Sequence, residues 1–204
     1  RMIKPVGSDE LNPLFVYDDA ENDKLKKEAE SLPSVIISSQ AAGNAVMMGA
    51  GYFNPLQGFM NVADAMGAAE KMTLTDGSFF PVPVLCLLES AEGINSGDRI
   101  ALRDPNLDGN PVLAVMDVSA VEEATDEQMA TMTKRAYGTD DMAHPGVAAF
   151  NGVGKFFIAG PIPASQPGKP PAENQRRLMA KTRPKTATET ILAIFIRLLR
   201  YIET

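Results

Sequence analysis

The chain has 204 residues, of which 45% are hydrophobic and 22% are charged, as in an ordinary globular protein of one domain with or without an appendage. Its formal net charge of −7 is unevenly divided. Residues 1–162 hold 11 basic residues (Lys and Arg) and 23 acidic residues (Asp and Glu), a charge of −12. Residues 163–204 hold 8 basic and 3 acidic residues, a charge of +5. Because an acidic body repels phosphate backbones, we expect no nucleic acid among the partners of residues 1–162.

In the first half of the chain, the pattern predicts helices alternating with short extended segments. Acidic residues follow Asp18 and lysines come later, which suits the dipole of a surface helix. Asn61 is placed to cap another helix, and Asp76-Gly77 is typical of a tight turn. We expect a helix over 18–32, a strand over 34–39, a helical turn ending at Gly49, a helix over 61–72 and a buried strand over 81–88.

In the second half, strands are expected over 99–103 and 112–118 around a polar hairpin loop. Thr125 and Gln128 have the spacing of a capping box that opens a helix to about residue 135. A loop over 137–146 and two short strands, 147–150 and 155–160, complete this part. Because strands and helices do not alternate regularly, we expect a compact α+β or barrel-like domain.

Residues 163–204 differ in composition from the rest. Five prolines and several basic residues predict a flexible linker over 163–187. Nine large apolar residues within 191–202 predict a short apolar helix over 188–204, which would need a partner, a membrane surface or its own domain to cover it. No stretch approaches the roughly 18 apolar residues of a membrane span, and the first ten residues lack the apolar core of a signal peptide, so a cytoplasmic protein is expected.

Single residues give few chemical signals. His144 is the only histidine, which excludes sites that need a histidine pair; it either acts as a general base beside Asp140 and Asp141 or bonds the turn that precedes Pro-Gly. Cys86 lies in the apolar run PVPVLCLL and is expected to pack as a buried thiol rather than act as a reactive group or ligand. The neighbouring acids Glu122 and Glu123 are expected on a solvated face.

Two loops imitate ligand-binding motifs without completing them. The loop from Asp104 to Gly109 begins like a calcium-binding EF-hand loop, but its twelfth position is Val115 where a glutamate is needed, so a hairpin turn is expected. Gly49 and Gly51 lack the rest of a phosphate-binding loop and are expected to allow close backbone packing. The sequence therefore predicts no metal site.

Four blocks taken together resemble the N-terminal domain of ATP sulfurylase (sulfate adenylyltransferase), of the type in sulfur-oxidising bacteria. They are GAGYFNPLQGFM (49–60), MTLTDGSFFPVPVL (72–85), GDRIALRDPNLDGNPVLAVMDV (97–118), and YGTDDMAHPGV (137–147) with FIAGPI (157–162). The resemblance covers about residues 2–162 and implies a β-rich, PUA-like pseudo-barrel with a few helices, within the α+β class. It divides the chain into a PUA-like domain over 1–162, the linker over 163–187 and the helix over 188–204.

The resemblance also implies what this chain lacks. In the family, a second domain holds ATP and sulfate on two histidine-containing segments and, with the assistance of magnesium, forms adenosine 5'-phosphosulfate and pyrophosphate; neither segment occurs here. We therefore expect no catalytic residue, no cofactor and no activity from this chain alone. The family-block positions expected to be structural are Pro55, Gly58, Phe59, Gly77, Pro83, Asp104, Pro145 and Gly146. Arg103 and His144 are the candidates to face a substrate in an intact enzyme.

Three interpretations of the chain stay open. A frame change or truncation near codon 162 would leave 163–204 without a function. A genuine short protein could instead dock its terminal helix on a separate catalytic domain or a full-length ATP sulfurylase. An RNA-binding PUA-like module is the third, against which the charge of residues 1–162 argues. The oligomeric state is left open.

Overall fold

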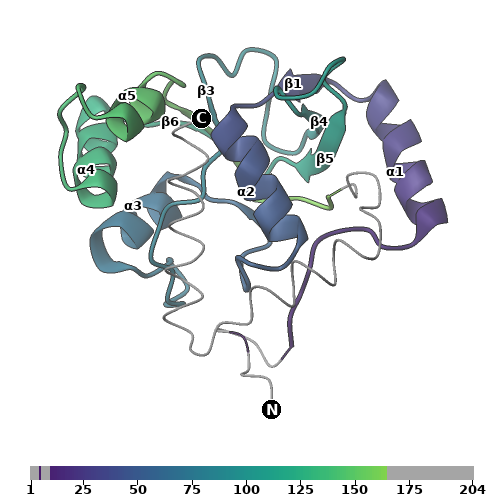
Figure 1. Cartoon of the computed structure of the whole chain (residues 1–204), viewed down its shortest axis with the longest axis horizontal. Coiled ribbons are helices and arrows are strands. Elements are labelled where there is room, and N and C mark those ends of the chain that lie inside the picture. Colours follow the sequence, from purple (N-terminus) through teal and green to yellow (C-terminus); the bar gives the residue numbers. More distant parts are fainter. Residues whose placement is uncertain (1–4, 6–9, 165–204) are drawn as a thin grey trace. The chain divides into compact units, whose positions relative to one another are not determined.

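The computed structural model describes residue 5 and residues 10–164, and in this part of the chain it has five helices and seven strands (Figure 1). The mixture of helices with small sheets confirms the α+β class. The predicted helix over 188–204 lies outside the described residues, and so does the predicted linker over 163–187 except for residues 163 and 164.

The first four helices begin close to where the sequence predicts, and the fifth lies where a loop and a strand are predicted. They are α1 (Asp19–Ser31), α2 (Ser39–Gly49), α3 (Val62–Lys71), α4 (Asp126–Tyr137) and α5 (Pro145–Asn151). In the first four, the residue before the helix accepts a hydrogen bond from a backbone N–H of the first turn through its side chain, which stabilises the helix end; these residues are Asp18, Ser38, Asn61 and Thr125. The predicted helical turn ending at Gly49 is a full helix of 11 residues.

The strands form two small sheets. They are β1 (Ser34–Ile36), β2 (Gly58–Phe59), β3 (Leu87–Leu88), β4 (Arg99–Arg103), β5 (Val112–Asp117), β6 (Ala120–Glu123) and β7 (Phe156–Pro161). The first sheet has the order β1-β4-β5, with β1 parallel and β5 antiparallel to β4. In the second, β7 pairs antiparallel with β2, β3 and β6. Ala164 bridges to Ala114 of β5 just after β7, so the chain links the two sheets.

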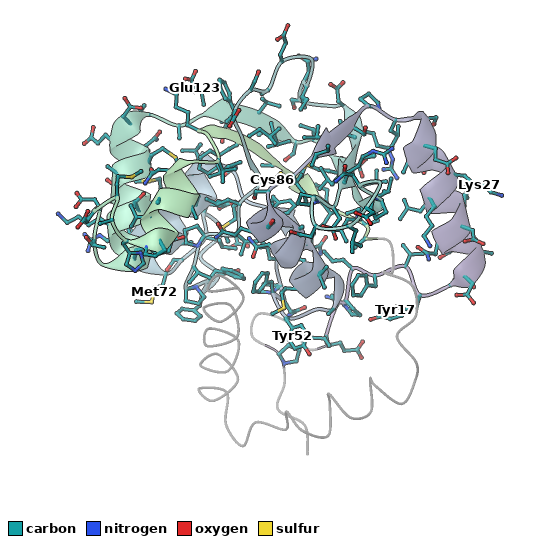
Figure 2. The ribbon with its side chains drawn as sticks, turned by 45° about the horizontal axis from the view of Figure 1, so that its top comes forward. Tyr17, Lys27, Tyr52, Met72, Cys86 and Glu123 are labelled. Carbon is teal, nitrogen blue, oxygen red and sulfur yellow. The ribbon has the colours of Figure 1, made fainter. Side chains whose placement is uncertain are left out.

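The main core lies between the two sheets and the helices α2, α3 and α4. Its fully buried members include Met48, Ile100, Met132 and Phe157. Cys86 is buried there as predicted, and Figure 2 shows it near the centre of the molecule. A second, smaller cluster joins α1 to the other face of the β4–β5 hairpin.

Residues 147–150 form part of α5, so the predicted strand there is wrong. Three features favour a helix: the His144 side chain accepts from the Val147 N–H, Pro145 stands at the first helical turn, where its missing N–H costs nothing, and Val147 and Phe150 face the core at helical spacing. The apolar letters VAAF alone do not distinguish these two states.

The predicted strand over 81–88 is also largely wrong, although the segment is buried. Only Leu87 and Leu88 join a ladder, as β3. Pro81 and Pro83 have no N–H to donate, so residues 81–84 do not join the ladder with β7. The Val84 carbonyl accepts from the Met60 N–H at 3.0 Å.

Candidate functional site

Arg103 and Asp104 lie at the end of β4 and the start of the β4–β5 loop, where they hold the loop in shape. An Nη1 group of Arg103 donates to the Asn110 carbonyl at 3.1 Å. A carboxylate oxygen of Asp104 accepts from the Asn106 backbone N–H at 2.8 Å and from its side-chain amide at 2.9 Å. The acidic loop is therefore organised by its own amides, as expected of a hairpin turn.

His144 is exposed and precedes α5. Its Nδ1 accepts from the Val147 N–H at 3.4 Å, and its ring lies 5.7 Å from the ring of Tyr137. Gly146 is buried behind it, where a Cβ would stand 2.7 Å from the Tyr137 ring. Because α5 and β4 are well separated in Figure 1, the two substrate candidates, His144 and Arg103, are not brought together.

The other family-block positions lie at turns and close contacts. Gly58 and Phe59 are the two residues of β2 and are buried. Asp76 accepts from the Ser78 N–H across Gly77, which has a φ of 87°, and this hydrogen bond lowers the pKa of the Asp76 carboxyl. Pro55 and Pro83 are half-buried, and Pro145 opens α5.

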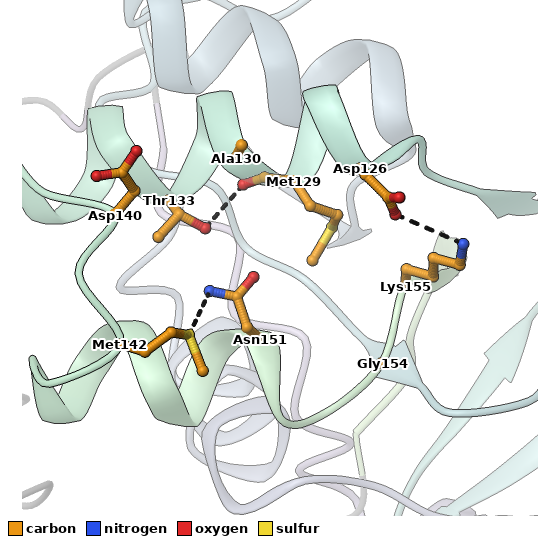
Figure 3. Close-up of a pocket in the computed structure, with 9 residues that line it drawn as sticks. All are labelled: Asp126, Met129, Ala130, Thr133, Asp140, Met142, Asn151, Gly154 and Lys155. Carbon is orange, nitrogen blue, oxygen red and sulfur yellow. Dashed lines mark hydrogen bonds and ion pairs between the residues drawn. The ribbon is translucent and has the colours of Figure 1, made fainter.

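A groove between α4 and α5 is the candidate functional site in the described part of the chain. Its volume is about 460 Å³, and Figure 3 shows the side chains that line it. Met129 and Met142 form its apolar part, and Asp126, Asp140 and Lys155 contribute charges. The remaining lining residues are Ala130, Thr133, Asn151 and Gly154.

Four polar side chains of the groove, those other than Asp140, bond to the protein's own atoms. The Thr133 hydroxyl donates to the Met129 carbonyl at 2.7 Å, and the Asn151 amide donates to the Val147 carbonyl at 3.0 Å. Lys155 Nζ lies 3.0 Å from a Glu123 oxygen and 3.7 Å from an Asp126 oxygen. The bond to Glu123 is the main reason why the pKa of Lys155 is raised.

The groove can therefore hold an apolar group between two methionines, but its lysine is engaged by carboxylates. Within residues 10–164, no three His, Cys, Asp or Glu side chains are grouped so that they could hold a metal ion. The groove is not predictable from the strand expected over residues 147–150, which belong to α5; the helix-opening pattern His-Pro-Gly is the signal that could have indicated it.

Glu122 and Glu123 are adjacent in β6 but differ in their surroundings. The Glu122 carboxylate accepts from the Val62 N–H at 2.8 Å and so satisfies an amide at the start of α3. Its predicted place on a solvated face is therefore wrong, whereas Glu123 is exposed as predicted. The difference arises because the start of α3 packs beside β6, 60 residues away in the chain.

Burial explains the state of Cys86. The thiol is 1% exposed, and desolvation raises its pKa from 9.0 to about 12. Among the helices of residues 10–164, none has the length and apolar character that a membrane span requires.

Comparison with known proteins agrees with the blocks identified in the sequence. The PUA-like domain family matches residues 3–167. Over 161 residues (79% of this chain), the chain is 69% identical to the sulfate adenylyltransferase of Allochromatium vinosum and 66% to that of the Riftia pachyptila sulfur-oxidizing endosymbiont. It is 52% identical over the same length to that of Alcanivorax borkumensis. The matches cover 41%, 36% and 40% of these relatives, so the chain spans about two fifths of their length.

A solved structure, the hexameric APS kinase from Thiobacillus denitrificans, superposes with a TM-score of 0.61 over 89% of this chain and 32% of that chain. At 24% sequence identity this likeness shows the fold alone. The relatives confirm the resemblance to the N-terminal domain of ATP sulfurylase from sulfur oxidisers. With its mixed sheets, five described helices and a family match over 3–167, this chain belongs to the PUA-like domain family.

Proposed function

We propose that this chain serves as the N-terminal accessory domain of a sulfate adenylyltransferase and does not catalyse the reaction by itself. In the family that it resembles, the intact enzyme converts ATP and sulfate to adenosine 5'-phosphosulfate and pyrophosphate. The observation that carries the proposal is the 69% identity to the Allochromatium vinosum enzyme over 161 residues, a length close to that of the whole described domain.

The surroundings of the polar residues support an accessory role. Stabilising the charge that develops in adenylyl transfer needs cations and hydrogen-bond donors that converge on the phosphate. Here Arg99 pairs with Glu28 and Asp117, and Lys155 pairs with Glu123 and Asp126. Arg103 donates to a loop carbonyl. These cations stabilise the fold of the domain and are engaged before any substrate arrives.

The experiment is a reverse-reaction assay, in which the purified 204-residue chain is given adenosine 5'-phosphosulfate, pyrophosphate and magnesium. We expect no ATP above the blank. Residues 1–164 are then joined to the part of the Allochromatium vinosum enzyme that this chain does not match, and we expect this chimera to form ATP. ATP formation by the 204-residue chain alone, or an inactive but folded chimera, contradicts the proposal.

Two further predictions accompany the proposal: the protein is located in the cytoplasm, and it has no nucleic-acid partner. The prediction of no nucleic-acid partner rests on charge, because residues 1–162 hold 23 acidic and only 11 basic residues. A salt-dependent shift of RNA mobility on adding the chain would instead favour the RNA-binding alternative.

A further inference from the structure

Eight large hydrophobic side chains are exposed in the described part of the chain. Five of them lie in the segments 11–17, 51–53 and 72–80, which contact one another. We call these five the apolar face: Leu11, Tyr17, Tyr52, Met72 and Phe79, each between 51% and 58% exposed. Single exposed hydrophobic residues are normal, but a connected group of them marks an interaction surface.

One half of the apolar face is the segment 11–17 and the loop beside it. The rings of Tyr17 and Phe15 lie 6.3 Å apart, edge to face. Leu11 packs so closely on Gly51 that a Cβ there would stand 3.1 Å from the Leu11 Cγ, which places Leu11 beside the loop that carries Tyr52. Figure 2 shows Tyr17 and Tyr52 on the same lower side of the molecule.

The other half of the apolar face consists of Met72 and Phe79, whose segment packs beside the loop of Tyr52. The next residue, Phe53, packs edge to face on Phe80 with ring centres 6.1 Å apart. The Phe80 N–H donates to the Met72 carbonyl at 2.9 Å, and Phe79 bridges to the residue after Met72. Met72 also lies on the lower side in Figure 2.

The described domain ends beside this face. Ala164 forms a parallel bridge with Phe15; its N–H donates to the Leu14 carbonyl at 3.0 Å, and its carbonyl accepts from the Val16 N–H at 3.1 Å. In the Allochromatium vinosum relative, 59% of the chain lies outside the match, given that the match covers 41%. The part that follows the matched domain there would emerge next to the apolar face.

The charged residues near the apolar face favour one kind of binding partner over another. The residues of this face are flanked in sequence by carboxylates at Glu10, Asp18, Asp19, Glu70 and Asp76 and by one cation, Lys71. A second copy of this chain would bring like charges together, which disfavours pairing. A domain that binds ATP and sulfate has to gather cations, and a basic surface complements this acidic rim.

We infer that the apolar face is the docking surface for the remaining, nucleotide-binding part of a sulfate adenylyltransferase. Tyr17 and Tyr52 are its central anchors, since aromatic side chains contribute most to interface energy. The inference rests on the proposed function, but it concerns where the two parts touch and can fail separately.

Hydroxyl-radical footprinting with mass spectrometry tests it on two proteins, the 204-residue chain and the chimera described above. We expect labelling of Tyr17 and Tyr52 to fall by about fivefold or more in the chimera, since an interface core excludes water. Leu107 and Met142, which are 56% and 59% exposed and lie outside the face, are internal controls that keep their labelling.

The outcomes separate this inference from the proposed function. An active chimera in which Tyr17 and Tyr52 stay labelled overturns the docking surface and leaves the function intact. A protected face in a folded, inactive chimera overturns the function alone, and an unprotected, inactive chimera overturns both. If Tyr17 and Tyr52 were already protected from labelling in the 204-residue chain, a second copy or another segment of this chain would cover the face, which contradicts the inference.

A matched pair of double variants checks that the anchors act through the interface. In the chimera, Tyr17→Ser with Tyr52→Ser should restore the labelling of Leu11. Ile36→Ser with Leu107→Ser removes two equally exposed hydrophobic side chains from outside the face and should leave Leu11 protected. Equal effects of the two pairs would contradict the role of the tyrosines, and circular dichroism verifies that each variant is folded.

Discussion

Gly58 in β2 and Gly160 in β7 meet backbone to backbone: a Cβ added to Gly58 would overlap the carbonyl oxygen of Gly160. Gly160 in turn has no room beside the Asp117 carbonyl and has a φ of 151°. This close approach lets β7 pair with β2 near its end, directly before the chain reaches Ala164 and the apolar face.

Gly58→Ala should therefore destabilise the domain by about 2–4 kcal/mol, because the new methyl group meets backbone that cannot move aside. Gly43→Ala is the matched control: its Cβ meets no atom within 4 Å in the middle of α2, and alanine should stabilise that helix by about 0.5–1 kcal/mol. Urea unfolding followed by circular dichroism measures both, and a loss smaller than 1 kcal/mol in Gly58→Ala would contradict the close contact.

Glu122→Ala should cost about 1–2 kcal/mol, since it removes a charged acceptor from the first turn of α3. Glu122→Gln keeps an acceptor without the charge and should lose roughly half as much. The neighbouring Glu123→Ala breaks only an exposed pair with Lys155 and should cost less than about 0.5 kcal/mol. If unfolding in urea gave equal losses for the two alanine variants, the bond from Val62 to Glu122 would not be stabilising.

His144 gives a test of the substrate-facing alternative. His144→Ala should lose about 0.5–1 kcal/mol of stability by removing the acceptor at the start of α5, whereas His144→Asn should retain it. The same two substitutions are then made in the active chimera. Normal activity in His144→Asn supports a helix-capping role, and a loss of activity at full stability would mean that the imidazole faces a substrate.

Cys86 should make the stability fall at high pH. Its pKa in the folded protein is about 12, above its usual 9.0, so the unfolded chain loses the thiol proton at a lower pH than the folded one. The contribution of the buried thiol to folding stability is therefore complete below pH 9.0 and is lost progressively between pH 9.0 and about 12. At pH 10 the loss should be about 1.4 kcal/mol.

The measurement compares the unfolding free energy of the wild-type chain with that of Cys86→Ala at pH 8 and pH 10. The alanine variant lacks a core thiol and is less stable at both values, but the difference between the two proteins should shrink at pH 10. A difference that is independent of pH would show that the thiol is accessible to solvent. Native Cys86 should also react with a thiol reagent only after unfolding.

Features that depend on neighbours a few residues apart were predictable. The caps at Asn61 and Thr125 follow from a side chain and an amide three residues apart, and the strands 99–103 and 112–117 from runs of apolar residues around a turn. The burial of Cys86 follows in the same way from its apolar neighbours. Each of these features depends only on residues that are close together in the sequence, so the sequence is enough to predict it.

The sequence by itself thus determined the α+β class, the acidic charge of the body, most helix starts and, through four blocks, the family. Only the tertiary structure decided that Glu122 caps α3 while Glu123 faces solvent, that α5 forms one wall of a groove, and that the segment 11–17 lies beside Gly51 and Ala164. The physical reason is distance along the chain: these contacts join segments tens of residues apart, so they exist only in the folded chain and leave no local pattern in the sequence.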